Sequence, residues 1–273
     1  MEENYSQDSR GKAPTNGAHR SCCLCLLLSS FLFLSLISPK AKAIDSEAQA
    51  LLEKSRVQLQ SNKNKTHAIL KIIEPTGEIK IREMDLQTLQ SEKTFKAMAR
   101  MTAPVDIKGT SVLVVIENGE QQQWLYLPSS KQVRRISSVK KSSGLLGSEL
   151  SPEDLNPDAF KGAEAKLLKK DAKVAIVELT PKAGNSEYSK IDTTFSLETS
   201  LPIKTEYFTG STLVKRVEFL DYKAYSEHIF RAQKIHILNL VKNRGTDIEL
   251  SQIDVKANLA DKNFTPQALQ TSW

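Results

Sequence analysis

The feature that most constrains this chain is a succession of short runs, between Thr66 and Val255, in which apolar and polar side chains alternate. Alternation places every second side chain on one face of an extended strand, so each run predicts a half-buried β-strand. Many short strands joined by tight turns favour one antiparallel sheet. We therefore predict a mainly β protein whose single curved antiparallel sheet has about eleven strands.

The alternation is clearest at 95–101 and continues at 112–116, where both faces carry apolar side chains. Proline, glycine and asparagine punctuate the runs, as in EPTG at 74–77, PVDIKG at 104–109 and NG at 118–119. These residues supply the backbone conformations that tight turns require. The turns therefore predict that neighbouring strands follow one another along the chain as hairpins.

Two or three helices accompany the predicted strands, and Thr265-Pro266 could start the short last one. Residues 44–59 have apolar side chains at helical spacing, Leu52 among them, and Asp45 or Ser46 can cap the helix. SPEDLNP at 151–157 predicts a short helix with proline in its first turn and acids near its N-terminus. Because the first helix has one apolar face, it can lie as a lid across the open side of a curled sheet.

The N-terminus predicts a secretory signal peptide. A polar segment with three basic residues precedes the uncharged run 22–37, and Ala41-Lys42-Ala43 supplies a small-x-small cleavage site. An uncleaved membrane anchor is the alternative, but the run is shorter than the roughly 20 apolar residues of a membrane span. We predict cleavage after Ala43, which leaves residues 44–273 as one domain.

The positions of the cysteines indicate the cellular compartment in which the protein works. Cys22, Cys23 and Cys25 are the only cysteines and all lie in the predicted leader, where none follows a lipobox. An exported eukaryotic domain often carries disulfides, whereas residues 44–273 have no cysteine. The pattern favours the periplasm of a Gram-negative-type bacterium.

Motifs of catalysis and metal binding are absent from the sequence. The predicted mature chain has three histidines, His67, His228 and His236, and none has a partner at metal-ligand spacing. No nucleophile elbow, phosphate-binding loop or dinucleotide fingerprint occurs. We predict no enzyme activity, no cofactor and no metal, and an enzyme acting on a lipid ranks last among the alternatives.

The stretch WLYLPSSKQVRRISSVKKSSGLLGSEL, residues 124–150, allows three interpretations. Its basic residues with Trp124 and Tyr126 could bind a nucleic acid, but a net charge of +6 is weak for that role and export argues against it. A structural interpretation is a strand pair with a solvated basic edge, since lysines on edge strands discourage aggregation. For any single residue, a place in the core is the simpler expectation.

The third interpretation is a lipid site. The inner face of a curled sheet forms an apolar cavity, and aliphatic linings hold acyl chains without specific geometry. Arg134 and Arg135 could meet a head group or a partner's acids at the rim, although neighbours on a strand point to opposite faces. Residues 142–147 predict a flexible loop whose Leu145 and Leu146 suit a gate.

The same stretch resembles a signature block of the bacterial outer-membrane lipoprotein-sorting protein family, which is similar in fold to the carrier LolA. Leu145 and Leu146 stand where the family has phenylalanine and methionine, and Glu149 stands where it has aspartate. The segments that carry the resemblance are WLYLP at 124–128, VRRI at 133–136, LGSEL at 146–150 and EDL at 153–155, with PVDIKGT at 104–110 and NFTPQAL at 263–269.

The resemblance implies an unclosed half β-barrel covered by lid helices, in a periplasmic protein that holds the acyl chains of lipoproteins or other lipids. It also implies an inner-membrane partner of the RND or MMPL transporter type and an outer-membrane acceptor. Arg134 and Arg135 are the predicted rim or partner residues. The predicted lipid cavity and gate residues are Leu52, Trp124, Tyr126, Ile136, Leu145 and Leu146.

Two further functions stay open. An outer-membrane barrel often ends in an aromatic residue, as this chain does at Trp273, but 263–273 is a poor strand and aromatic girdles are missing. A lipid-binding sensor that regulates an envelope partner without carrying cargo would share the fold and the pocket. Transfer of cargo to an acceptor membrane would separate the sensor from the carrier.

Overall fold

The computed structural model describes residues 45–137, 142, 144–182 and 186–271. The predicted signal peptide at 1–43, with its cleavage site, lies outside the described residues. So do Lys140 and Lys141 of the basic stretch and part of the predicted loop 142–147.

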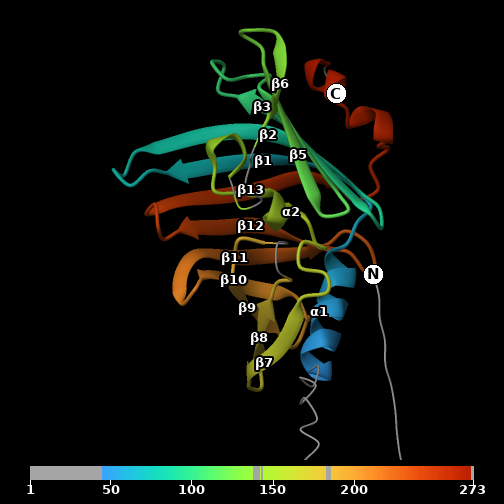
Figure 1. The fold of residues 1–273 in the computed structure, drawn as a ribbon, viewed down its shortest axis with the longest axis vertical. Coiled ribbons are helices and arrows are strands. Elements are labelled where there is room, and N and C mark those ends of the chain that lie inside the picture. The colour runs from blue at the N-terminus through green and yellow to red at the C-terminus, as the bar shows by residue number, and fades with distance from the viewer. Residues whose placement is uncertain (1–44, 138–141, 143, 183–185, 272–273) are drawn as a thin grey trace, which may run out of the picture. The chain divides into compact units, whose positions relative to one another are not determined.

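Thirteen strands form one antiparallel sheet in the order β6-β5-β4-β3-β2-β1-β13-β12-β11-β10-β9-β8-β7. Figure 1 shows β6 at the top of the sheet and β7 at the bottom. The strands are β1 Lys63–Ile73, β2 Ile79–Gln90, β3 Thr94–Ala103, β4 Ser111–Glu117, β5 Glu120–Leu127, β6 Gln132–Ile136, β7 Glu164–Lys170, β8 Val174–Thr180, β9 Lys190–Ser196, β10 Pro202–Thr209, β11 Thr212–Ala224, β12 Phe230–Asn239 and β13 Arg244–Asp254.

The topology confirms the predicted single antiparallel sheet and its unclosed form. Chain neighbours pair as hairpins within β1 to β6 and within β7 to β13, and the pairing of β1 with β13 joins these two halves. In the described residues β6 and β7 are edges that do not pair with each other, so the sheet curls without closing.

The predicted strand number was slightly low, and β7 shows why. Its sequence EAKLLKK has four charged residues, and its two inward side chains, Ala165 and Leu167, give almost no alternation signal. Charged side chains suit an exposed edge strand because they discourage pairing with other chains. The same charges hide the strand from a pattern search based on apolar periodicity.

Helix α1, Ser46–Leu59, confirms the helix predicted at the start of the domain. Asp45 caps it, since its Oδ1 accepts a hydrogen bond from the Ala48 backbone nitrogen at 3.1 Å. Asp45 Oδ2 accepts a second bond, at 2.7 Å, from the backbone nitrogen of Leu167 on β7. One carboxylate therefore caps the helix and ties it to the edge strand of the sheet.

The connection from β6 to β7 crosses in front of the sheet, where Figure 1 shows the short helix α2, Pro152–Leu155. The SPEDLNP motif correctly predicts this short helix, at whose start Asp154 Oδ2 accepts a hydrogen bond from the Ser151 backbone nitrogen at 2.7 Å. A single 3-10 turn, η1 Leu145–Gly147, precedes it. We call the face of the sheet that packs against α1, η1 and α2 the inner face.

The outer face carries a second, smaller apolar cluster. Met98, Leu113 and Trp124 stand side by side on β3, β4 and β5. The C-terminal segment with η2 Asp261–Asn263 and η3 Gln267–Gln270 covers them and contributes Leu259, Phe264 and Leu269. None of the helices in the described part of the chain has the length and apolar character needed to span a membrane.

Candidate functional site

Two adjoining cavities lie on the inner face of the sheet. The first has a volume of about 200 Å³ and is walled mainly by aliphatic and aromatic side chains from both halves of the sheet. It is roofed by the connection from β6 to β7 through Leu150 and Leu155. Its apolar wall includes Ala68, Met84, Leu86, Phe95, Ile235 and Ile248.

The second cavity, of about 220 Å³, lies under α1. Leu52 and Leu59 of the helix face Phe160, Tyr207 and residues of β8 to β11 across it. Neither cavity alone reaches the roughly 300–1,000 Å³ of a typical ligand pocket, but the two together do. They share the walls Leu59, Asp154, Pro157, Pro202 and Phe219.

A buried ion pair stands where the two cavities meet. Lys215 Nζ lies 2.5 Å from Asp154 Oδ2, and about 5% of each side chain is exposed. Ser151 Oγ donates to the same carboxylate oxygen at 2.8 Å, and the Tyr207 hydroxyl donates to Oδ1 at 3.3 Å. Burial, with Asp154 close by, raises the pKa of Tyr207 well above its ordinary value. The tyrosine therefore stays a neutral donor that helps to fix α2 to the sheet.

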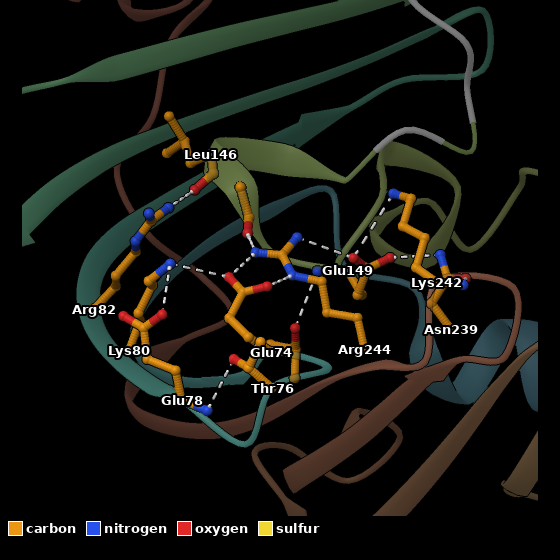
Figure 2. Close-up of polar contacts among 12 residues, drawn as sticks. Glu74, Thr76, Glu78, Lys80, Arg82, Leu146, Glu149, Asn239, Lys242 and Arg244 are labelled. Carbon is orange, nitrogen blue, oxygen red and sulfur yellow. Dashed lines mark hydrogen bonds and ion pairs between the residues drawn. The ribbon is translucent and has the colours of Figure 1, made fainter.

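A second polar group, which we call the clamp, holds the turn before α2. Figure 2 shows Arg244 of β13 between Glu74 and Glu149. Its Nε and Nη2 each donate to Glu74 at 2.9 Å, and Nη1 donates to Glu149 at 3.1 Å. Asn239 donates to the other Glu149 oxygen at 2.7 Å. A bidentate arginine pair of this kind fixes position as well as charge.

The clamp also binds the backbone of η1. Arg244 Nη2 donates to the Gly147 carbonyl at 2.8 Å, and Arg82 donates to the Leu146 carbonyl. Hydrogen bonds from Arg244 lower the pKa of Glu74 below its ordinary value, and Glu74 in turn raises the pKa of Arg244. Both groups therefore remain charged at neutral pH and keep the clamp closed.

Gly147 fits this place because of its backbone. It has a φ of +75°, and an added Cβ would lie 2.6 Å from the Arg82 guanidinium. Leu146 has a φ of +49°, which an L-residue seldom adopts. The glycine in the LGSEL motif thus allows two consecutive left-handed residues, which turn the chain back over the sheet.

The predicted cavity and gate residues separate into two groups. Leu52 lines the second cavity, and Leu145 and Leu146 pack into the inner apolar cluster. Leu145 is 2% exposed and the clamp holds its neighbours, so the described part of 142–147 is an anchored turn. Neither Leu145 nor Leu146 lines the two inner cavities.

The strand residues of the signature block lie elsewhere. Trp124 and Tyr126 pack into the outer cluster, and neither lines the two inner cavities. Ile136 is half-buried on edge strand β6 beside Gln123, and it does not line those cavities either. Arg134 and Arg135 are exposed on opposite faces of β6, and Arg135 lies 5.9 Å from the centre of the Trp124 ring.

One wall of the first cavity was missed by the sequence patterns. Tyr222, Arg231 and Ala232 line it from the β11–β12 hairpin. The hairpin residues 221–233 mix charged, aromatic and small side chains without a clear alternation. No signal in the sequence distinguishes them from solvated turn residues.

The described residues hold no group of three or more histidine, cysteine, aspartate or glutamate side chains arranged to bind a metal ion. The charged groups at the cavities instead form ion pairs and hydrogen bonds that position the roof. The geometry defines a binding protein fold, an unclosed half-barrel whose roofed inner face encloses apolar space.

Comparison with known proteins shows which family the chain belongs to. A family model described as "uncharacterized protein"-like matches residues 93–271, so the chain belongs to this family. No curated protein matches the sequence significantly.

Solved structures agree with the fold. A domain described as a candidate outer membrane lipoprotein-sorting protein, from Vibrio parahaemolyticus, is 25% identical with a TM-score of 0.73 and covers 83% of this chain and 99% of its own. A DUF1329 family protein from Desulfovibrio piger is 24% identical with a TM-score of 0.73 over 83% of this chain and 98% of its own. A LolA superfamily protein from Nitrosomonas europaea, 18% identical, has a TM-score of 0.64 over 80% and 97%. These similarities confirm the resemblance to lipoprotein-sorting, LolA-like proteins.

Proposed function

We propose that this protein is a periplasmic carrier that holds the acyl chains of lipoproteins or other lipids in the two inner cavities. The observation that carries the proposal is the roofed apolar space between α1, α2 and the inner face. The structural similarity to a candidate lipoprotein-sorting domain supports the same function. The export signal predicted at 1–43 supports the periplasmic location.

The physical task of such a carrier matches the site. Burying one methylene group is worth roughly 0.8 kcal/mol, so an acyl chain does not leave a membrane unless equivalent apolar surface receives it. The cavity walls supply that surface without specific geometry. Release then requires the roof to move, and α1 is the element that meets solvent on its other side, since its Val57 is 49% exposed.

The first experiment is to purify the protein from the cell envelope without detergent and to identify bound lipids by mass spectrometry after solvent extraction. A stoichiometric acyl-chain ligand is the expected result and would name the cargo class. A protein that is empty and also fails to bind an added fatty acid would refute the proposal.

A cavity-filling substitution tests the place of binding. Ala232, which is 6% exposed, lines the first cavity, so Ala232→Phe should fill it and abolish fatty-acid binding. Ala257, 4% exposed in the outer cluster, provides the matched control. Ala257→Phe should cost comparable stability, about 1–3 kcal/mol, and leave binding of the folded protein unchanged. Equal effects of both substitutions on binding would place the ligand elsewhere.

Roof movement is tested by a covalent link. Lys170 of β7 and Glu47 of α1 form an ion pair, so cysteines at these two positions can be joined by a short bismaleimide. Residues 44–273 contain no other cysteine. We expect linked protein to exchange bound lipid much more slowly than the same variant before linking. Unchanged exchange would rule out α1 as the moving element.

The second candidate function is a lipid sensor or accessory protein that regulates an envelope partner without carrying cargo. The hydrogen bonds that anchor η1 favour a rigid site of this kind. The two cavities by themselves do not require that a bound lipid is transferred to an acceptor. Transfer of a fluorescent lipid from loaded protein to acceptor vesicles separates the two functions. For either function, we propose an inner-membrane RND or MMPL transporter as partner, and co-purification with such a protein tests that step.

A further inference from the structure

The first cavity has an uneven distribution of charge. Of the residues that line it, only Asp154 and Arg231 are charged. Asp154 is neutralised by its buried ion pair with Lys215. Arg231 comes from the opposite wall, on β12, and its charge requires a separate explanation.

Arg231 is a half-buried arginine without an acidic partner among the described residues. Its Nη1 donates to the carbonyl of Phe230 at 2.7 Å, which satisfies one of the five N–H groups of a guanidinium. The nearest ionisable groups that influence it are the hydroxyls of Tyr222 and Tyr225. Burial lowers the pKa of Arg231 to about 10, so it is still charged at neutral pH.

Two other arginines are paired with acids, whereas Arg82 donates to the carbonyl of Leu146. Arg244 is paired with Glu74 and Glu149 in the clamp, and Arg56 is paired with Glu53 and Asp158. A half-buried charge without a counter-ion is costly, because burial disfavours the charged form. A ligand that brings its own negative charge would remove this cost, and an arginine fork matches the geometry of a carboxylate or phosphate.

The walls near Arg231 are consistent with such a ligand. Ala232, Phe219 and Ile235 line the same cavity as Arg231 and give it apolar surface. The Tyr222 hydroxyl is occupied by a 2.9 Å hydrogen bond to the carbonyl of Pro202, so it does not neutralise the arginine. An acyl chain in the first cavity can therefore reach the charge without crossing another charged group.

We propose that the ligand of the first cavity is an amphiphile with one anionic end, a carboxylate or a phosphodiester, and that Arg231 binds this end while the acyl chain fills the cavity. The proposal rests on the proposed lipid-binding function and adds the chemical class of the ligand. It also gives the ligand a direction, with its polar end at the β11–β12 hairpin.

The test compares cis-parinaric acid with its methyl ester, two fluorescent probes with the same chain that differ in the charge of one end. At about pH 8 the acid is ionised. We expect the full mature protein to bind the acid at least about tenfold more tightly than the ester, as for one hydrogen-bonded charge. Arg231→Gln should bind both probes equally, with the affinity of the ester.

Two further variants make the test specific. Arg231→Lys keeps the charge and loses the planar fork, so it should retain part of the preference for the acid. Arg216→Gln on neighbouring strand β11 removes a half-buried arginine that is paired with Glu206 outside the cavities. This control should keep the full preference.

The outcomes separate the two proposals. A wild type that binds acid and ester equally, or an Arg231→Gln variant that keeps the preference, would overturn the role of Arg231 and leave the acyl cavity intact. Binding of neither probe would overturn both. If Arg231→Gln does not fold, the comparison of acid with ester on the wild type still tests whether the protein prefers an anionic ligand. Displacement of the bound acid by palmitate or by phosphatidylglycerol then identifies a carboxylate or a phosphodiester as the preferred end.

Discussion

The inner and outer faces of the sheet carry the same kinds of apolar side chain, but these side chains join two different clusters. On β4 and β5, inward residues such as Val112 and Val114 join the cluster that surrounds the cavities. Their outward neighbours, Leu113 and Trp124, join a cluster sealed by the C-terminal segment. Apolar side chains on both faces of one strand thus surround cavities on one side and pack against the C-terminal segment on the other.

The difference lies in what covers each face. The outer cluster is closed by side chains that insert directly, such as Leu269, which is fully buried. The inner face is covered by α1 and α2, and ion pairs and hydrogen bonds at Asp154 and Glu149 hold α2 and the turn before it. The polar contacts that hold α2 leave space between it and the sheet, whereas the apolar side chains of the C-terminal segment fill the space above the outer face.

The largest expected effect breaks one of these supports. Asp154→Asn would leave the Lys215 ammonium buried without its counter-ion, so we expect the free energy of unfolding to fall by about 3–5 kcal/mol. Denaturant unfolding measures it. The control is Glu206→Gln, which removes the more exposed pair with Arg216 on the outer face and should cost about 1 kcal/mol or less. Similar losses of unfolding free energy in both variants would mean that the pair of Lys215 and Asp154 stabilises the fold no more than the exposed pair does.

The next effect compares core leucines of the two faces. Leu86 lines the first cavity at 4% exposure, and Leu269 is fully buried in the outer cluster. Each substitution by alanine should cost about 2–5 kcal/mol. Only Leu86→Ala should change fatty-acid affinity, because it alone enlarges the inner space. Titration of both variants with a fluorescent fatty acid checks this, and altered binding by Leu269→Ala would contradict the separation of the faces.

A smaller effect concerns the clamp and depends on pH. The folded pKa of Glu74 lies below its ordinary value of 4.5, so its stabilising contribution is present above that value and is lost as pH falls through the folded pKa. The melting temperature of Glu74→Gln should therefore lie below that of the wild type at neutral pH, and the two should converge in acid. A difference that is constant with pH would show that the charge of Glu74 does not matter.

The smallest effect belongs to the exposed edge. Arg135→Ala loses a cation–π contact with Trp124, 5.9 Å to the ring centre, and should cost at most about 1 kcal/mol. Arg134→Ala should stay within about 0.5 kcal/mol of the wild type. Neither should alter lipid affinity. A large loss of lipid affinity in either variant would show that edge strand β6 contributes to the binding site.

Much of the fold was predictable because the sheet is a succession of hairpins. Local alternation and turn residues specify each hairpin, and Ser151 with Pro152 marks the start of α2 in the sequence. Strand β7 escaped prediction because lysines, and not apolar residues, dominate an exposed edge. Leu52 was correctly placed on the face of α1 that meets the sheet, since helical spacing determines that face.

The binding site was less predictable. The sequence by itself determined the antiparallel sheet, its helices, and two apolar faces on the strand that contains Trp124 and Tyr126. Only the tertiary structure decided which of these faces encloses cavities, because alternation separates two faces without saying what covers them. It also decided that Arg231 lines the first cavity without an acidic partner among the described residues, while Glu149 and Arg244 form a pair across 95 residues. Such pairings depend on the register of distant strands, which no local pattern records.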